Sequence, residues 1–163
     1  MAPSLAQSRV AIPLLLLVGG LGPLGAAWFT QYVLHYPPCP LCMWQRYPYA
    51  LPVLAGLLAL LPRLRQARWL LLIGALGWFV TAGIAAYHVG IEQGWIVHES
   101  GCTAKALGGS LEDIRAQLMA APLVACNTVS FRLLGLSMAH WNLASGLALG
   151  VMALSLRRQM RPA

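Results

Sequence analysis

Apolar residues gather into four long runs along this chain, with polar stretches between them. The runs cover about residues 10–31, 43–61, 69–91 and 140–156. An α-helix of about 20 apolar residues is long enough to cross the hydrocarbon core of a bilayer. The pattern therefore predicts an all-α membrane protein, a four-transmembrane-helix bundle that forms a single membrane domain over residues 1–163.

The composition agrees with a lipid environment. Apolar residues make up 59% of the chain and charged residues only 9%, whereas roughly a quarter of the residues of a soluble domain are charged. Disorder is excluded as well, because disordered chains are poor in large apolar residues.

The charges are distributed unevenly along the chain. Basic residues lie at the ends of the apolar runs or between them, and all four acidic residues fall between the third and fourth runs. Basic residues of membrane proteins are retained on the cytoplasmic side. We therefore expect the linker 62–68 and both termini to be cytoplasmic, and the loops at about 32–42 and 92–139 to lie outside. The net charge of +7 does not indicate nucleic-acid binding, because no basic stripe is interleaved with aromatic residues.

The first run contains closely spaced glycines. Gly19, Gly20, Gly22 and Gly25 predict a surface of small residues against which another helix packs closely. The segment around Gly25 also resembles a signal-peptide cleavage site, but the apolar stretch is longer than such signals usually are.

All four cysteines, Cys39, Cys42, Cys102 and Cys126, lie in the two outer loops or at their edge. In an oxidising compartment they could form two structural disulfides. A Cys-x-x-Cys pair suits that role poorly, because so short a loop restricts the unfolded chain little. It is more typical of redox chemistry, in which one sulfur is attacked and the other resolves the mixed disulfide. Zinc is a further alternative, although a second tight cysteine pair is missing; haem attachment fails because Met43 follows Cys42.

Prolines precede the second run and should fix where its helix begins. Pro37, Pro38 and Pro40 prevent an earlier start, so Cys42 should lie at the helix N-terminus, where the helix dipole stabilises a thiolate. Arg46 follows one turn later on the same face. It either extends toward the interface or stabilises the thiolate and the negative charge that develops on an electron acceptor; we favour the second interpretation.

His88 lies near the outer end of the third run. Ionisable residues inside membrane spans are functional candidates, although a histidine bonded to backbone or water is an alternative. Glu92, four residues later, could pair with His88 across one helical turn.

The long loop carries the pattern of a short amphipathic helix. Ser110 and Asp113 resemble a capping box, and apolar residues recur at spacings of four and three at Leu107, Leu111, Ile114 and Leu118. We expect this helix to lie on the outer membrane surface or to cap the bundle.

Taken together, these motifs resemble the DsbB family of disulfide bond formation proteins. The resemblance covers nearly the whole chain and rests on Cys39-Pro40-Leu41-Cys42-Met43-Trp44-Gln45-Arg46, Tyr87-His88, Gly101-Cys102, Cys126-Asn127 and Leu134-Gly135-Leu136-Ser137-Met138. Some members carry an acidic residue where this chain has Gln45.

The resemblance implies an enzyme of the bacterial inner membrane, a quinone-dependent thiol oxidase. It implies disulfides Cys39–Cys42 and Cys102–Cys126, with attack on Cys102 by a reduced periplasmic DsbA-like partner. Electrons would pass to Cys39–Cys42 and from Cys42 to ubiquinone or menaquinone, near Arg46 and His88. The alternatives are a paralogue that serves a dedicated partner, a vitamin K epoxide reductase-like enzyme, whose loop cysteines precede the Cys-x-x-Cys, and a non-catalytic protein with two structural disulfides.

Overall fold

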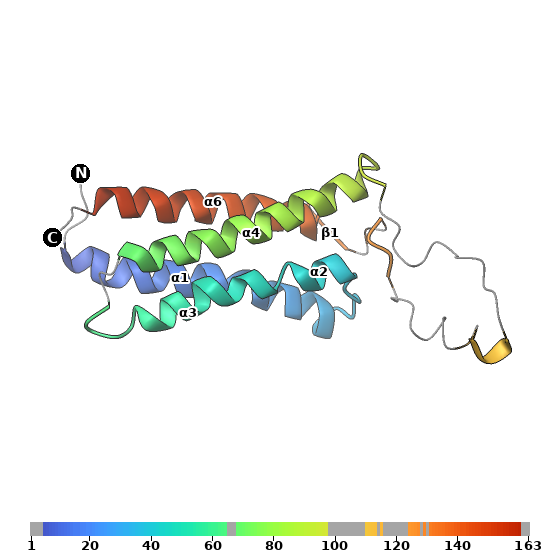
Figure 1. The fold of residues 1–163 in the computed structure, drawn as a ribbon, viewed down its shortest axis with the longest axis horizontal. Coiled ribbons are helices and arrows are strands. Elements are labelled where there is room, and N and C mark those ends of the chain that lie inside the picture. Colours follow the sequence, from blue (N-terminus) through green and yellow to red (C-terminus); the bar gives the residue numbers. More distant parts are fainter. Residues whose placement is uncertain are drawn as a thin grey trace.

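A computed structural model describes residues 5–64, 68–97, 110–113, 115, 124–127, 129 and 131–160, with side chains from residue 10 onward. Long helices run lengthwise through an elongated bundle (Figure 1). The elements are α1 (Leu5–Trp28), the π-helical turn η1 (Phe29–Val33), α2 (Pro40–Trp44), the 3₁₀ turn η2 (Tyr47–Tyr49), α3 (Ala50–Leu58), α4 (Arg68–Glu92), β1 (Arg132–Leu133), β2 (Leu136–Ser137) and α6 (Met138–Gln159).

Within the described part of the chain, three helical segments are long and apolar enough to cross a membrane. They are Val10–Val33, Arg68–Glu92 and Met138–Gln159. They coincide closely with the first, third and fourth predicted runs, so the sequence pattern located these helices correctly.

The second predicted run, 43–61, is not one continuous helix and is not among these three spans. It is divided into α2, η2 and α3. Pro48 has no N–H group and cannot continue the α-helical ladder. The backbone tightens there, and the Tyr49 N–H bonds the carbonyl of Arg46 at 3.2 Å, three residues back. Apolar content predicted the helical character of this run but not its interruption, and the count of four spans stays a prediction.

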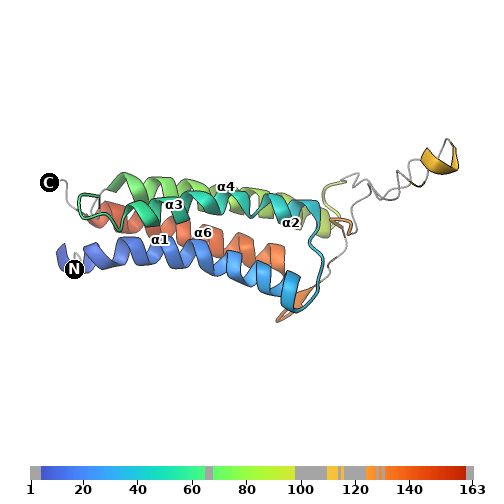
Figure 2. The ribbon, with the colours of Figure 1, turned by 90° about the horizontal axis from the view of Figure 1, so that it is seen from below.

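The helices pack in a definite order. The most extensive contact joins α4 to α6, and α3 packs on both α1 and α4, an arrangement that Figures 1 and 2 show from two directions. Trp78 of α4 is fully buried at the centre of the bundle, and its Nε1 donates to the Gly19 carbonyl of α1 at 3.2 Å. The core around it contains Ile12, Leu16, Tyr49, Leu70, Leu71 and Ala75.

The prediction of a glycine surface on α1 is confirmed for two of its four residues. A Cβ atom at Gly19 would lie 2.7 Å from the Trp78 ring, and one at Gly20 would lie 2.7 Å from Val53. These two glycines therefore allow close helix packing, as predicted. Gly22 and Gly25 have nothing among the described residues within 4 Å of such an atom, so the prediction was wrong for them. The reason is geometric: they lie on the part of α1 that α3 and α4 do not cover.

Large apolar side chains cover much of the outer surface of the bundle. Examples from the three candidate spans are Leu14, Val18, Leu76, Val80, Leu147 and Val151. Contiguous apolar exposure of this kind is costly in water and is favourable against lipid chains, which agrees with the membrane class.

A short hairpin, which the sequence reading missed, leads into α6. Strands β1 and β2 pair antiparallel, with Leu133 opposite Leu136. The two residues between them, Leu134 and Gly135, have φ angles of 52° and 83°, as a type I′ turn requires. Gly135 was the available signal. Ser137 ends the hairpin and caps α6, since its side chain accepts from the His140 N–H.

The predicted helix in the long loop is described only at its start. The Ser110 N–H donates to the Asp113 carboxylate at 3.0 Å, and the Asp113 N–H donates to the Ser110 hydroxyl at 3.3 Å, which is the reciprocal pattern of a capping box. These bonds lower the pKa of Asp113. Most of the remaining amphipathic pattern, with Leu107, Ile114 and Leu118, lies outside the described residues.

Candidate functional site

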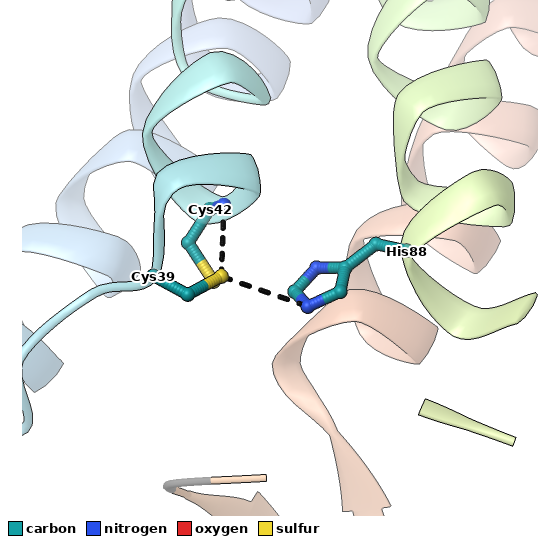
Figure 3. A group of neighbouring side chains, drawn as sticks. All are labelled: Cys39, Cys42 and His88. Carbon is teal, nitrogen blue, oxygen red and sulfur yellow. Dashed lines mark hydrogen bonds between the residues drawn. The ribbon is translucent and has the colours of Figure 1, made fainter. Parts of the chain in front are cut away.

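The Cys-x-x-Cys segment forms the first turn of α2. The helix begins at Pro40 with Cys39 as its N-cap, in agreement with the start that the prolines predict. The backbone N–H of Cys42 donates to the Cys39 sulfur at 3.3 Å, so the sulfur satisfies one of the free N–H groups of the helix end. Figure 3 shows both side chains on the face of α2 that is turned toward α4.

Cys39 and Cys42 are free thiols in this structure, and their sulfurs are hydrogen-bonded at 2.9 Å. The bond makes the two thiols unequal. Donation to Cys42, together with burial, raises the pKa of Cys39 to about 12. The hydrogen bond from Cys39 lowers the pKa of Cys42, although its burial acts in the opposite direction. Cys42 is therefore the sulfur that carries negative charge more readily.

His88 of α4 lies beside this pair, as Figure 3 shows. It is 3% exposed, and its Nε2 atom is 3.6 Å from the Cys39 sulfur. The other ring nitrogen, Nδ1, is 3.0 Å from the amide nitrogen of Gln45. Nε2 is also 3.6 Å from the carboxylate of Glu92, which confirms the contact across one helical turn that the sequence suggested.

Glu92 connects this site to the start of α6. Its carboxylate accepts a 2.5 Å hydrogen bond from the Ser137 hydroxyl and lies 3.6 Å from Nδ1 of His140. A buried carboxylate needs such partners to offset the loss of water.

Arg46 lies after α2 and bonds to the first apolar run. Its Nη1 donates to the Gln31 side-chain oxygen at 2.6 Å and its Nη2 to the Ala27 carbonyl at 3.5 Å. The buried Nε atom has no hydrogen-bond partner among the described residues. The guanidinium is thus held between two helical segments, and its Nε–H group is the donor that has no acceptor among the described residues.

Cys126 joins the cysteine pair from the far side of the long loop. It is 1% exposed and belongs to a small apolar cluster with Cys39 and Ile91, against which Cys42 also packs. The structure thus brings three of the four predicted cysteines together; Cys102 lies outside the described residues.

A cavity of about 390 Å³ opens beside these residues. Cys39, Cys42, Arg46 and His88 all line it, together with apolar side chains of α1 and of the segment before α6, among them Pro23, Leu24, Ala27, Phe131, Leu133 and Met138. This combination of a mostly apolar wall and a few convergent polar groups is typical of a site for a small organic molecule.

Three polar residues next to the site, Asn142, Thr81 and Tyr49, were missed by sequence reasoning, and all three bond to one another or to Gln45. The Asn142 amide nitrogen donates to the Gln45 side-chain oxygen at 2.6 Å and contacts the Thr81 hydroxyl at 3.0 Å. The Tyr49 hydroxyl donates to the Asn142 side-chain oxygen, and the Thr81 hydroxyl donates to the Gln45 backbone carbonyl at 2.8 Å. An asparagine near the start of the fourth apolar run was the available signal.

The zinc alternative has a partial geometric basis. One potential ligand atom from each of Cys39, Cys42 and His88 lies within 4.8 Å of the others. Three ligands are one fewer than a closed structural zinc site has.

Long apolar helices and a buried thiol pair at one end define a membrane protein suited to thiol–disulfide chemistry, and comparisons with known proteins agree. The family model for disulfide bond formation protein DsbB matches residues 9–156. The chain belongs to the DsbB family.

Individual relatives match over most of their length. An uncharacterized protein of Rickettsia prowazekii (strain Madrid E) is 29% identical over 129 residues, which cover 77% of this chain and 74% of that protein. Disulfide bond formation protein B of Hahella chejuensis (strain KCTC 2396) is 32% identical, covering 76% of this chain and 78% of the relative. The protein of the same name from Dechloromonas aromatica (strain RCB) is 31% identical, covering 77% and 78%. No solved structure matches this chain significantly.

Proposed function

We propose that this protein reoxidises a periplasmic DsbA-like dithiol protein and passes the electrons through two cysteine pairs to a membrane quinone. Cys102 and Cys126 would form the pair that meets the protein partner. Cys39 and Cys42 would form the pair that meets the quinone. In this scheme the protein is a quinone-dependent protein-disulfide oxidoreductase.

One observation carries the proposal: Cys42 and Arg46 line the same apolar cavity. Cys42 lies in the first turn of α2, where the helix dipole favours negative charge, and its pKa is lowered by the hydrogen bond from Cys39. A thiolate is the reactive form of cysteine. The site therefore combines an electron-rich sulfur with a cation in surroundings of low polarity, where electrostatic stabilisation is strong.

The residues that line the cavity fit a quinone ring. The apolar wall suits the ring and the start of an isoprenoid tail. The buried Nε of Arg46 lacks an acceptor among the described residues, and a quinone carbonyl could provide one. His88 lies across the thiol pair from α2 (Figure 3) and lines the same cavity, beside the place where the ring would bind. Either ubiquinone or menaquinone agrees with this set of residues.

The electron balance is simple. Oxidation of Cys39 and Cys42 forms one S–S bond and releases two electrons and two protons. A quinone bound in the cavity would accept both electrons and both protons and leave as a quinol. Cys42 provides the nucleophilic sulfur, Cys39 closes the disulfide, and Arg46 holds positive charge next to the acceptor.

The position of Cys126 supports electron transfer between the two pairs. Cys126 packs in one apolar cluster with Cys39, so a loop thiol can approach the membrane pair without a large movement. Thiol–disulfide exchange needs this proximity because it proceeds through a mixed disulfide. A dedicated thioredoxin-fold partner would use the same chemistry; the loop between Cys102 and Cys126 would decide which partner binds.

The charge pattern supports a bacterial inner-membrane location with both termini in the cytoplasm. The beginning of α1 and the end of α6 lie at one end of the bundle (Figure 1), and Arg157 and Arg158 occupy the last turn of α6. Glu92 and the thiol pair lie toward the other end. By the positive-inside rule the cysteine end would face the periplasm.

Turnover by purified protein tests this proposal. Reduced DsbA-like protein should be oxidised only when quinone is supplied, and one quinol should appear for each disulfide formed. Turnover that continues without quinone in the absence of oxygen, or no turnover with both substrates present, would refute it. A variant with serine at both Cys102 and Cys126 should lose oxidation of the partner.

A further inference from the structure

Hydrogen bonds connect the thiol pair to the interior of the bundle through a continuous series of side chains. We call this series the polar chain; it consists of Thr81, Tyr49, Asn142, Gln45, His88 and Cys39. It links α4 and α6 with the interrupted second helix. Because amide and imidazole groups can be turned around, the direction of each bond has to be derived from a group whose role is fixed.

The fixed group is the backbone carbonyl of Gln45. A carbonyl can only accept, and the interruption of the helix removes its usual donors: Pro48 has no N–H, and the Tyr49 N–H bonds Arg46 instead. The Thr81 hydroxyl donates to this carbonyl at 2.8 Å. A buried backbone carbonyl is costly to leave unpaired, so the Thr81 proton is committed to this bond.

The orientation of Asn142 follows. With its proton used, the Thr81 oxygen can only accept a bond from Asn142. The atom of Asn142 that lies 3.0 Å from it must therefore be the amide nitrogen. The Asn142 oxygen then faces the Tyr49 hydroxyl, which is able to donate.

The orientation of Gln45 follows in turn. The second N–H of the Asn142 amide is directed at the Gln45 side chain at 2.6 Å, so the Gln45 atom in that contact must be its oxygen. The Gln45 amide nitrogen then faces Nδ1 of His88 at 3.0 Å. Nδ1 must accept this bond, which means that it carries no proton.

The environment of the second ring nitrogen leads to the same result. Nε2 of His88 lies 3.6 Å from the Glu92 carboxylate and 3.6 Å from the Cys39 sulfur. An ionised carboxylate has no proton, so it can only accept hydrogen bonds. A proton on Nε2 satisfies both contacts. The contacts of Nε2 therefore agree with the tautomer derived from the Gln45 side.

We infer that Gln45, oriented by Asn142 and Thr81, is a positioning residue that holds His88 as the neutral tautomer with its proton on Nε2, directed at the Cys39 sulfur. A second proton on Nδ1 would meet the N–H of Gln45 and break the series. From His88 onward each bond points toward Cys42: Nε2–H to Cys39, and the Cys39 S–H to the Cys42 sulfur. Bonds aligned in this way strengthen one another and support negative charge on Cys42. The role in electron delivery rests on the proposed function; the tautomer does not.

The direction of the hydrogen bonds at His88 also argues against a metal at the thiol pair. Histidines that bind metals usually donate their other N–H to an acceptor. Here Nδ1 of His88 accepts a bond, and Nε2, the nitrogen nearest the sulfurs, carries the proton. A metal bound there would require Gln45, Asn142 and Thr81 all to change their bonding.

Nitrogen NMR of the full chain tests the inference directly. Protein labelled with ¹⁵N-histidine, with its thiols reduced under anaerobic conditions at neutral pH, should show His88 as the Nε2–H tautomer. The signal is the one absent from His88→Gln, and it can also be identified by replacing His35, His98 and His140 in turn. An Nδ1–H tautomer or a doubly protonated ring at His88 overturns the inference, without reliance on any variant of the polar chain.

Two variants test the role of the polar chain. Gln45→Glu presents a carboxylate that accepts from Nδ1, so the Nε2–H-only signal should disappear. Asn142→Asp should turn the Gln45 amide around and produce the same change. In both, the rate at which Cys42 is alkylated should fall about fivefold, the effect of losing one neutral hydrogen bond. Gln93 is an exposed residue just after α4. Gln93→Glu makes the same change in charge and should alter neither the NMR signal of His88 nor the alkylation rate of Cys42.

The outcomes separate the two claims. The expected tautomer in a protein that reduces no quinone would refute the proposed function and support the inference. Quinone reduction by a protein whose His88 signal is unchanged in Gln45→Glu would refute the inference and leave the proposed function intact.

Discussion

The guanidinium of Arg46 donates a 2.6 Å hydrogen bond to the side-chain oxygen of Gln31, which joins the second helical segment to the first near the thiol pair. Gln31 lies in the π-helical turn η1, where α1 changes its winding. Such turns are frequent at functional sites. The bond keeps the charge of Arg46 at the cavity, rather than leaving the side chain to extend freely into the interface.

We expect Arg46→Ala to lower kcat/KM for quinone about 10- to 100-fold, because hydrogen bonds to charged groups contribute about 1.5–3 kcal/mol. Arg46→Lys should restore only part of this loss, since an ammonium group lacks the guanidinium geometry. The measurement is quinol formation at varied quinone concentration. Arg63→Ala, an exposed change in the linker between α3 and α4, is the matched control. Unchanged quinone kinetics in Arg46→Ala would leave Arg46 with a structural role only.

The two thiols should differ in their pH dependence. The pKa of Cys42 is lowered, so Cys42 should remain reactive toward iodoacetamide below about pH 8.5, where an ordinary thiol is mostly protonated. The pKa of Cys39 is raised to about 12, so Cys39 should stay unmodified across the same range. Mass spectrometry of the reduced protein after alkylation at a series of pH values measures both.

Replacing Cys39, whose thiol donates the hydrogen bond to Cys42, provides the control for this difference in reactivity. Cys39→Ala takes away the hydrogen bond to Cys42 and should shift the reactivity of Cys42 to higher pH. Equal alkylation of the two thiols in the wild-type protein would contradict the assignment of the thiolate to Cys42.

Local sequence signals located much of this site. Prolines set the start of α2, and helical spacing paired His88 with Glu92. Pro48 was a local signal for the interruption that we did not use. The roles of Thr81 and Asn142 could not be predicted, because the free Gln45 carbonyl and its donor are brought together only when α4 and α6 pack on the second helix. The same holds for Gln31, whose position depends on the π-helical turn. Gly22 and Gly25 were misjudged because spacing alone does not tell which face of a helix is covered.

The close packing of α4 on α6 should be sensitive to a single methyl group. A Cβ atom at Gly146 would lie 2.9 Å from the Trp78 backbone oxygen, so one helix must move, at a cost of about 1–3 kcal/mol. Gly146→Ala should therefore lower the apparent Tm in detergent. Gly83→Ala on α4, where nothing in the described structure lies within 4 Å, should leave Tm unchanged or raise it, since alanine favours helix. A similar Tm for the two variants would contradict this packing.

Ser137 should stabilise the end of the bundle that carries the thiols. Its hydroxyl caps α6 and donates to the buried Glu92 carboxylate. Ser137→Ala removes both bonds, and we expect a loss of about 2 kcal/mol, combining an N-cap with a bond to a charged group. Ser137→Thr retains a hydroxyl and should recover most of the lost Tm. Thermal unfolding in detergent measures the difference, and an unchanged Tm in Ser137→Ala would show that the two bonds contribute nothing.

A single-turnover experiment tests the central claim most directly. Protein with its thiols reduced is mixed with one equivalent of quinone without oxygen, and quinol and the Cys39–Cys42 disulfide are quantified together. We predict one quinol for each disulfide, no quinol from Cys42→Ser, and an undiminished yield from Cys102→Ser. Equal loss of quinol in both variants, or quinol formed by Cys42→Ser, would contradict the assignment of electron delivery to Cys42.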